Sequence, residues 1–230
     1  MKENDMTVTW LGQAGLLFEE QGFTAMIDPY LSDSVAKVDA TKARRAPVEE
    51  RFFDLTPDVL LFTHDHLDHY DPETAPRFLE KTDKQMTVLS PTSVWEKAHC
   101  HGNGHNYVQF NPGTSWTEGP FRFTAVPAAH SDPYAIGILL EVGGKCYYVT
   151  GDTLYNEMIF PFLPAEIEAV FLPINGVGNN MNMRDAARFA ARTGARRVVP
   201  LHFGLFDNLD PNEMPCEGKV IPQLYQKIII

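Results

Sequence analysis

The sequence predicts an α+β fold in which two β-sheets pack against each other and helices cover them from outside. Two observations predict it: β-hairpins follow one another in the middle of the chain, and strand–helix–strand units recur beside them. At 230 residues, with 44% hydrophobic side chains, the chain is long enough to bury a full core and short enough for one unit. We therefore expect a single domain over residues 1–230.

The first part of the chain begins with short strands. Apolar and polar residues alternate over 7–11, a glycine-bounded turn occupies 12–15, and two further strands are predicted over 16–18 and 23–27. Residues 32–51 are polar and irregular, which predicts a long loop. Loops of this length inside compact domains are usually functional or mobile.

The remainder of the chain mixes strands with helices. The continuous apolar run over 58–62 predicts a strand that is buried on both faces. Asn182 and Gly194 are the expected N-cap and stop of a helix over 182–193, and Gly143 and Gly144 are typical of a hairpin turn. The other elements are predicted as helices over 72–82 and 92–99 and as strands over 86–89, 106–110, 121–127, 135–142, 145–150, 169–172 and 197–201.

A segment rich in potential metal ligands directly follows the strand over 58–62. In it, His64, His66, Asp68 and His69 form an HxHxDH pattern. Burying three imidazoles and a carboxylate without partners is costly, and divalent cations remove that cost. His64 and His66 are spaced to hold one ion, while Asp68 and His69 on the following turn can reach a second. The alternative is a solvated acidic loop, which four ligand-type residues in six positions disfavour.

Three more candidate ligands each follow a predicted apolar strand: His130, Asp152 and His202. Taken singly, each is better explained as a satisfied core residue or a cap, and Asp152 would cap a helix that starts near Thr153. Taken together with the HxHxDH segment, they complete a site for two ions. Each ion would have two or three ligands of its own, and one carboxylate would bridge the pair.

A second group of histidines lies elsewhere in the sequence. His99, His101 and His105 surround Cys100, so a second metal site is the alternative to be weighed there. The glycine-broken run over 102–104 indicates an exposed loop instead. We therefore expect these three histidines not to be ligands of the catalytic site.

The composition disfavours several classes of protein. Against 19 Lys+Arg stand 30 Asp+Glu, and the net charge of -11 disfavours attraction to nucleic acid or to anionic membranes. No apolar run approaches the roughly 18 residues of a membrane span, and residues 1–6 lack the apolar centre of a signal peptide. Three widely spaced cysteines form no CxxC pair and suit a reducing cytosol. We expect a cytoplasmic protein without a membrane partner, and the sequence leaves a homo-oligomer open.

These separated blocks resemble a known family. The HxHxDH pattern, His130, Asp152 and His202 occur in the order typical of metallo-β-lactamase-fold hydrolases, and the chain looks like their L-ascorbate-6-phosphate lactonase-like group. The blocks that carry the resemblance are Thr9 to Gly15, Ile27 to Ser32, Thr63 to His69, Pro127 to His130, Thr150 to Thr153 and Pro173 to Gly176. The resemblance implies an αββα four-layer sandwich of two mixed sheets, with the site at one edge.

The resemblance also implies how the ligands divide between two ions. One ion would be held by His64, His66 and His130, the other by Asp68, His69 and His202, and Asp152 would bridge them. Asp28 would steady the ligand loop from behind, since ligating histidines generally need such a partner. The mixed ligand set suits two divalent ions of Zn, Mn or Fe, and the resemblance favours Zn or Mn.

The expected chemistry is hydrolysis. Two divalent ions about 3.5–4 Å apart lower the pKa of a shared water, so we expect a metal-bridging hydroxide as the nucleophile. Asp152 as the bridge and Asp68 as a proton acceptor are the candidate catalytic residues. The expected substrate is a small, anionic (phosphorylated) ester or lactone.

The alternative is a phosphodiesterase or nuclease acting on nucleic acid or lipid phosphodiesters. An electron-transfer diiron protein would need a flavin domain, and an inactive binding module would not keep seven ligands.

Candidate substrate contacts come from two places. Lys42, Arg44 and Arg45 concentrate positive charge in the loop over 32–51, and arginine matches phosphate or carboxylate groups; a solvated basic loop is the alternative. Asn175 follows the strand over 169–172 and is placed to present an amide to the pocket, although a plain turn explains it equally well.

A run of arginines recurs every four residues near the helix over 182–193. Its members are Arg184, Arg188, Arg192 and Arg196. This spacing is typical of an exposed helix face, which we favour over an RNA-binding stripe.

Overall fold

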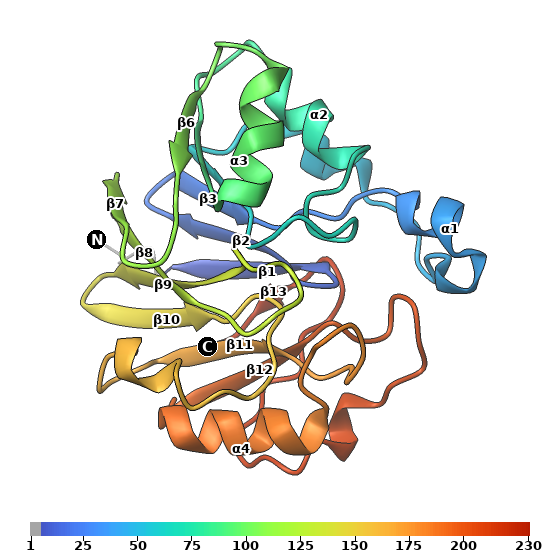
Figure 1. Cartoon of the computed structure of the whole chain (residues 1–230), viewed down its shortest axis with the longest axis vertical. Helices are drawn as coiled ribbons and strands as arrows, with labels where there is room; N and C mark the ends of the chain where they lie inside the picture. Colours follow the sequence, from blue (N-terminus) through green and yellow to red (C-terminus); the bar gives the residue numbers. More distant parts are fainter. Residues whose placement is uncertain (1–5) are drawn as a thin grey trace.

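The computed structural model describes residues 6–230 as two β-sheets stacked between helices (Figure 1). The first sheet has seven strands in the order β13-β1-β2-β3-β4-β5-β6. They are β1 (Thr7–Gly12), β2 (Gly15–Glu20), β3 (Phe23–Ile27), β4 (Val59–Leu61), β5 (Thr87–Ser90), β6 (Asn106–Gln109) and β13 (Lys227–Ile228). Strands β3 to β6 are parallel, so their carboxyl ends reach the same edge. Residues 1–6 are expected from the sequence to lack the apolar centre of a signal peptide. Of these, residues 1–5 lie outside the described residues.

The second sheet has six strands in the order β12-β11-β10-β9-β8-β7. They are β7 (Ser115–Glu118), β8 (Phe121–Pro127), β9 (Ile136–Val142), β10 (Lys145–Val149), β11 (Ala169–Pro173) and β12 (Arg197–Leu201). β9 and β10 form the expected antiparallel hairpin, whose turn residues Gly143 and Gly144 adopt φ angles of 57° and 78°. β10, β11 and β12 are parallel to one another.

Helices cover the outer faces of both sheets. α2 (Thr74–Leu79) and α3 (Thr92–Ala98) lie outside the first sheet, and α4 (Met183–Thr193) lies outside the second (Figure 1). The order helix, sheet, sheet, helix confirms the expected αββα sandwich and the α+β fold class. No helix within residues 6–230 combines the length and the hydropathy that crossing a bilayer requires.

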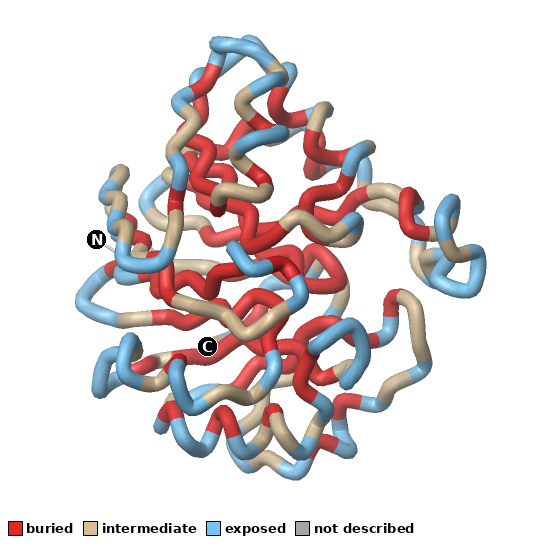
Figure 2. The backbone as a smooth tube through the Cα atoms, in the orientation of Figure 1, coloured by how far each residue is buried: buried red, intermediate tan, exposed pale blue. Residues whose placement is uncertain are grey.

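The main core lies between the two sheets, where Figure 2 shows buried backbone. Phe18 of β2 and Phe171 of β11 are both fully buried, and their rings meet edge to face with centroids 5.7 Å apart. Contacts of this kind from opposite sheets fix the distance between them, because aromatic rings dominate core packing. Hence the sandwich is a rigid frame for whatever its strand ends carry.

β4 shows why a continuous apolar run marks a central strand. Val59 and Leu61 point into the core between the sheets, whereas Leu60 points into a second core under α2 and α3. In that second core Leu60 belongs to the same cluster as Phe78 of α2 and Val94 of α3. A strand with both faces covered has no polar side, and its sequence therefore does not alternate.

Two parts of the structure differ from the sequence-based expectation. The segment predicted as an irregular loop over 32–51 contains α1 (Ser34–Val38) and a 3-10 turn (Ala40–Lys42), and a second 3-10 turn, Glu50–Asp54, begins at its end. α1 is too short to show helical periodicity and is held by tertiary contacts. Strands β7 and β13 were not expected either, because they are short edge strands whose pairing depends on distant residues.

The ends of α4 agree with their sequence signals. The Asn182 side chain accepts hydrogen bonds from the backbone N–H groups of Arg184 and Asp185, and Gly194 closes the helix in the left-handed region at φ 68°. Both predicted ends of this helix are confirmed.

We predict that Asn182→Ala lowers the free energy of unfolding by about 1 kcal/mol, because two N–H groups of the first turn lose their acceptor. Urea denaturation followed by circular dichroism measures the change. Asn103→Ala, the same substitution in the exposed loop over 102–104, is the matched control and should leave stability unchanged. Equal stability of both variants would contradict the capping role.

Candidate metal centre

Ligand-type side chains from four strand ends meet at one edge of the sandwich. The HxHxDH segment follows β4, His130 follows β8, Asp152 follows β10 and His202 follows β12. The structure thus brings together all seven residues that the sequence singled out, although they are spread over nearly 140 positions. Three groups of potential ligands result, each with ligand-type atoms within 4.8 Å of one another: His64 with His66 and His130, Asp68 with His69 and His202, and Asp28 with His64 and His69.

The first group is purely imidazole. His64 is fully buried, while His66 and His130 are half-buried. Nδ1 of His66 lies 3.1 Å from Nε2 of His130. Two nitrogens bound to one tetrahedral ion at 2.0–2.1 Å would stand about 3.3 Å apart, so this spacing fits a shared cation.

The second group combines imidazoles with carboxylates. Nε2 of His202 lies 3.2 Å from Oδ2 of Asp68 and 3.3 Å from Oδ2 of Asp152. Nε2 of His69 lies 3.3 Å from the same oxygen of Asp152. Asp152 therefore faces both histidines of this group and is the carboxylate nearest the middle of the cluster.

Buried atoms without hydrogen-bond partners mark the same point. Nε2 of His64 and Oδ1 of Asp152 have no partner, whereas the buried Nε2 atoms of His69 and His202 make no regular hydrogen bond and face only the carboxylates of Asp68 and Asp152. A buried polar atom without a partner costs about 1–3 kcal/mol, so proteins rarely leave several side by side. Imidazole nitrogen and carboxylate oxygen are the donor atoms that Zn, Mn and Fe accept. The residues present therefore fit divalent ions.

Asp28 contacts His69 and Thr63 and lies next to the candidate ligands. Its Oδ2 atom is 2.7 Å from Nδ1 of His69, and Oδ1 accepts a hydrogen bond of 2.8 Å from the backbone N–H of Thr63. The Thr63 hydroxyl donates to the same carboxylate. With these contacts made, Asp28 is occupied in orienting His69, and we do not count it among the ligands.

Gln13 is a functional residue that the sequence analysis missed. Its Nε2 atom donates to Oδ2 of Asp68 at 3.0 Å and lies 3.3 Å from Nδ1 of His202. Its backbone carbonyl accepts a hydrogen bond from the backbone N–H of His202 at 3.0 Å. One residue of the β1–β2 turn thus fixes two members of the second group. The only available signal was a glutamine between two glycines.

Two asparagines complete the surroundings of the second group. Nδ2 of Asn180 donates to Oδ2 of Asp152 at 2.7 Å. Nδ2 of Asn175 lies 3.0 Å from Nδ1 of His202, so this residue contacts a candidate ligand. Asn175 also lines the cavity next to the centre, where the sequence placed it as a substrate contact.

Burial and nearby charges set the protonation of the centre. Burial, helped by the neighbouring His69, lowers the pKa of His64 well below its usual value. Burial opposes charge on His202 too, but Asp152 and Asp68 outweigh it and raise its pKa to about 10. The same balance, led by Asp152, raises the pKa of His69. The pKa values of Asp68 and Asp152 are lowered, since both histidines outweigh their burial.

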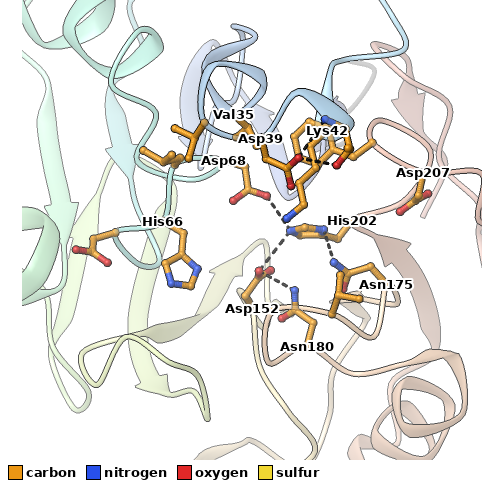
Figure 3. A pocket seen from close by; sticks show the side chains of 17 residues that line it. Val35, Asp39, Lys42, His66, Asp68, Asp152, Asn175, Asn180, His202 and Asp207 are labelled. Atoms are coloured by element: carbon orange, nitrogen blue, oxygen red, sulfur yellow. Dashed lines mark hydrogen bonds and ion pairs between the residues drawn. The ribbon is translucent and has the colours of Figure 1, made fainter.

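A cavity of about 610 Å³ opens beside the centre (Figure 3). His66, Asp68, Asp152 and His202 form its floor, so the candidate ligands are accessible to a small molecule. The remaining lining comes from the segment around α1, from the ligand loop after β4, from the loop after β11 and from the loop after β12. These residues are Val35, Val38, Asp39, Thr41, Lys42, Asp65, Leu67, Asn175, Val177, Gly178, Asn180, Phe206 and Asp207.

The basic residues of the segment over 32–51 have different positions. Lys42 lines the cavity and its side chain is directed into it (Figure 3). Arg44 and Arg45 are not among the lining residues. The Arg44 guanidinium donates to the carbonyl of Tyr30 at 2.9 Å and to the hydroxyl of Tyr225 at 2.6 Å, so it anchors the cavity wall instead of facing a ligand. The substrate contacts expected of Arg44 and Arg45 stay predictions, and the contacts of Arg44 do not favour its part in them.

The three remaining histidines lie apart from the centre and belong to none of its ligand groups within residues 6–230. His99 has Nδ1 2.6 Å from the carbonyl of Trp95 and stacks on that ring. Nδ1 of His101 lies 3.5 Å from Glu80. His105 is buried and accepts a hydrogen bond from a backbone N–H, so it has a structural role.

The chain is similar to known proteins over most of its length. Residues 24–203 match the family model of the beta-lactamase superfamily domain. A UPF0173 metal-dependent hydrolase of Exiguobacterium sp. is 31% identical over 217 residues, covering 87% of each protein. One from Ligilactobacillus salivarius is 30% identical over 206 residues, covering 87% of this chain and 86% of that protein. The structure of a metallo hydrolase from Ignicoccus hospitalis has a TM-score of 0.75 at 21% identity over 97% of both chains. None of these three carries the name of a lactonase, and the lactonase-like subgroup stays a prediction.

We predict that Gln13→Leu weakens metal binding about 10–100-fold, because Asp68 and His202 lose the amide that orients them. Leucine has a similar volume, so the buried site is still filled. Competition with a fluorescent chelator measures the affinity for Mn²⁺ and Zn²⁺. Gln109→Leu, an exposed glutamine of β6, is the control. Unchanged affinity in Gln13→Leu would show that the turn does not support the centre.

We also predict that metal binding releases protons. With a pKa raised to about 10, His202 is protonated at neutral pH when no ion is bound, and an ion must displace that proton. Affinity should therefore rise with pH, about tenfold per pH unit for each proton released. Calorimetry at pH 7 in two buffers of different ionisation enthalpy counts the protons. His202→Gln should release fewer, and absence of proton release from the unmodified protein would contradict the assignment.

Proposed function

Because this chain belongs to the beta-lactamase superfamily, within the UPF0173 metal-dependent hydrolase family, we propose that it hydrolyses a small ester or lactone with two divalent metal ions. One observation carries the proposal. The buried ligand-type atoms of His64, His69, His202 and Asp152 lie at one edge of the sandwich, and the site opens onto one cavity through Asp152 and His202.

The ligand sets that we propose follow the two groups of donor atoms. His64, His66 and His130 would hold one ion, and Asp68, His69 and His202 would hold the other. The Oδ2 atom of Asp152 lies 3.3 Å from Nε2 of His69 and 3.3 Å from Nε2 of His202, and Asp152 would bridge the two ions. When bound, such a pair of ions supplies an activated water and polarises the bond under attack. Zn and Mn are the ions that we favour, and Fe also suits the donor set.

Three side chains of the protein would have further roles in the reaction. Asp68 lines the cavity and has one oxygen held by Gln13, so its carboxylate is positioned to take a proton from the attacking water. Asp28 keeps the His69 ring in place from behind. Lys42 is the basic residue of the wall and would contact an anionic group of the substrate away from the reacting bond.

A phosphodiesterase acting on nucleic acid is the weaker alternative. Three of the four arginines near α4 contact other side chains of the protein. Arg188 stacks on Tyr155 and Arg192 stacks on Phe160, with guanidinium carbons 4.6 and 5.0 Å from the ring centres. Arg196 pairs with Glu166 and Glu168. These contacts and the net charge of -11 favour a small-molecule substrate.

The test combines metal analysis with hydrolysis. We predict that Asp152→Asn lowers the metal content from about two ions per chain to less than one and lowers kcat/KM on esters or lactones by more than about 100-fold, since a bridging carboxylate serves both ions. Asparagine keeps the shape and still accepts the hydrogen bond from Asn180. The substrates are simple esters and lactones, their phosphorylated analogues, and an aryl phosphodiester.

His99→Gln, outside the centre, is the control and should keep both metal and activity. Full metal occupancy in Asp152→Asn would exclude the bridging role. Activity confined to the phosphodiester would favour the alternative function.

A further inference from the structure

Exposed apolar side chains gather around the mouth of the cavity. Val38 is 76% exposed, Val177 is 60% exposed and Leu67 is 37% exposed, and all three line it. They come from three separate segments: the end of α1, the loop after β11 and the ligand loop after β4. Val35 and Phe206 add apolar surface deeper in the wall. Apolar residues that converge from distant parts of a chain around a cavity mark a binding surface.

The segment that carries Val38 is held firmly in position. Val35 packs in a small core with Tyr30 and Leu205, and Arg44 ties the same segment to Tyr225. The backbone N–H of Arg45 donates to the carbonyl of Leu205 at 3.0 Å. The exposure of Val38 is therefore a property of a fixed wall, and no packing partner covers it within residues 6–230.

The acidic residues of the wall are already satisfied. Asp39 accepts hydrogen bonds from the backbone and hydroxyl of Thr41, Asp65 pairs with Lys97, and Asp207 accepts from two backbone N–H groups. Lys42 forms no ion pair with any of the described residues. The wall thus offers one available cation and a larger apolar surface, which suits a substrate with a single anionic group and an apolar body.

We infer that the cavity selects substrates with an apolar acyl chain, held against Val38, Leu67 and Val177 while the ester or lactone group lies over the metal centre. This inference rests on the proposed hydrolase function and narrows its substrate class. A phosphorylated sugar would place hydroxyl groups against these side chains and gain nothing from them. Leu67 lines the same cavity as His66 and Asp68, its neighbours in the chain, so apolar surface and candidate ligands share one cavity.

The size of the effect follows from the hydrophobic contribution of a methylene group. Full burial of one methylene corresponds to about fourfold in an equilibrium or rate constant, and a half-open wall should give about twofold. From an acetyl to a hexanoyl ester, kcat/KM should therefore rise about 10-fold or more. The binding energy that the acyl chain gains away from the reacting bond raises kcat/KM.

The experiment uses the metal-loaded protein and p-nitrophenyl esters from acetate to octanoate. Val38→Ser and Val177→Ser, separately and together, should flatten the rise with chain length, read as the ratio of kcat/KM on hexanoate to kcat/KM on acetate within each variant. Met158→Ser is the matched control, because Met158 is 72% exposed and lies outside the cavity. It should keep the full rise. A wild-type series without any rise, or an equal rise in the double variant, would overturn the inference.

A binding measurement separates this inference from the proposed function. Calorimetry with sodium acetate and sodium octanoate on the metal-loaded protein should show octanoate binding at least about 10-fold tighter, with the difference lost in the double variant. If no ester is hydrolysed but this difference is found, the reaction proposed above fails while the apolar site stands. If octanoate and acetate bind equally, the apolar site is refuted whatever the hydrolytic activity.

Discussion

The structure depends on holding five imidazoles and two carboxylates together at a largely buried edge of two sheets. Such side chains lose hydration when they are buried, so the backbone must fix them before any ion binds. Three non-glycine residues at the centre adopt the left-handed region: Gln13 at φ 48°, Asp28 at 44° and His202 at 61°. Each costs about 1–3 kcal/mol and persists only where the surroundings demand it. Here the hydrogen bond from the backbone N–H of His202 to the Gln13 carbonyl and the hydrogen bonds from Thr63 to Asp28 hold the backbone in this conformation.

The sequence revealed those parts of the centre that rest on local pattern. HxHxDH follows an apolar run, and His130, Asp152 and His202 each end a strand, so topology alone brings them to one edge. Gln13 and Asn180 could not be found in this way, because nothing in their neighbourhood distinguishes an amide that orients a ligand from one in a turn. Their partners, Asp68 and Asp152, lie 55 and 28 residues away. The short helix α1 and the edge strands β7 and β13 were not predicted from the sequence for the same reason, because long-range contacts specify them.

Arg44 has contacts in the structure that its residue type does not reveal. A cation in a long loop beside a metal centre resembles a substrate contact, but its guanidinium spans the carbonyl of Tyr30 and the hydroxyl of Tyr225. Tyr225 also donates to the carbonyl of Pro47. These bonds join the segment around α1 to the C-terminal part of the chain. The loop does form one wall of the cavity, and the residues that line it there are Val35, Val38, Asp39, Thr41 and Lys42.

Protons and metal ions compete for the same place in this arrangement. Without an ion, the carboxylates of Asp68 and Asp152 favour protons on His69 and His202, which is why the pKa values of these histidines are raised. A divalent ion that replaces those protons meets the same carboxylates, so the exchange changes the local charge little. Since the centre itself would hold the reacting ester or lactone group, the wall needs few cations of its own. Lys42 is the available cation of the wall, so the wall can be more apolar than the floor that the candidate ligands form. The apolar surface of the wall then distinguishes between substrates that carry the same ester or lactone bond.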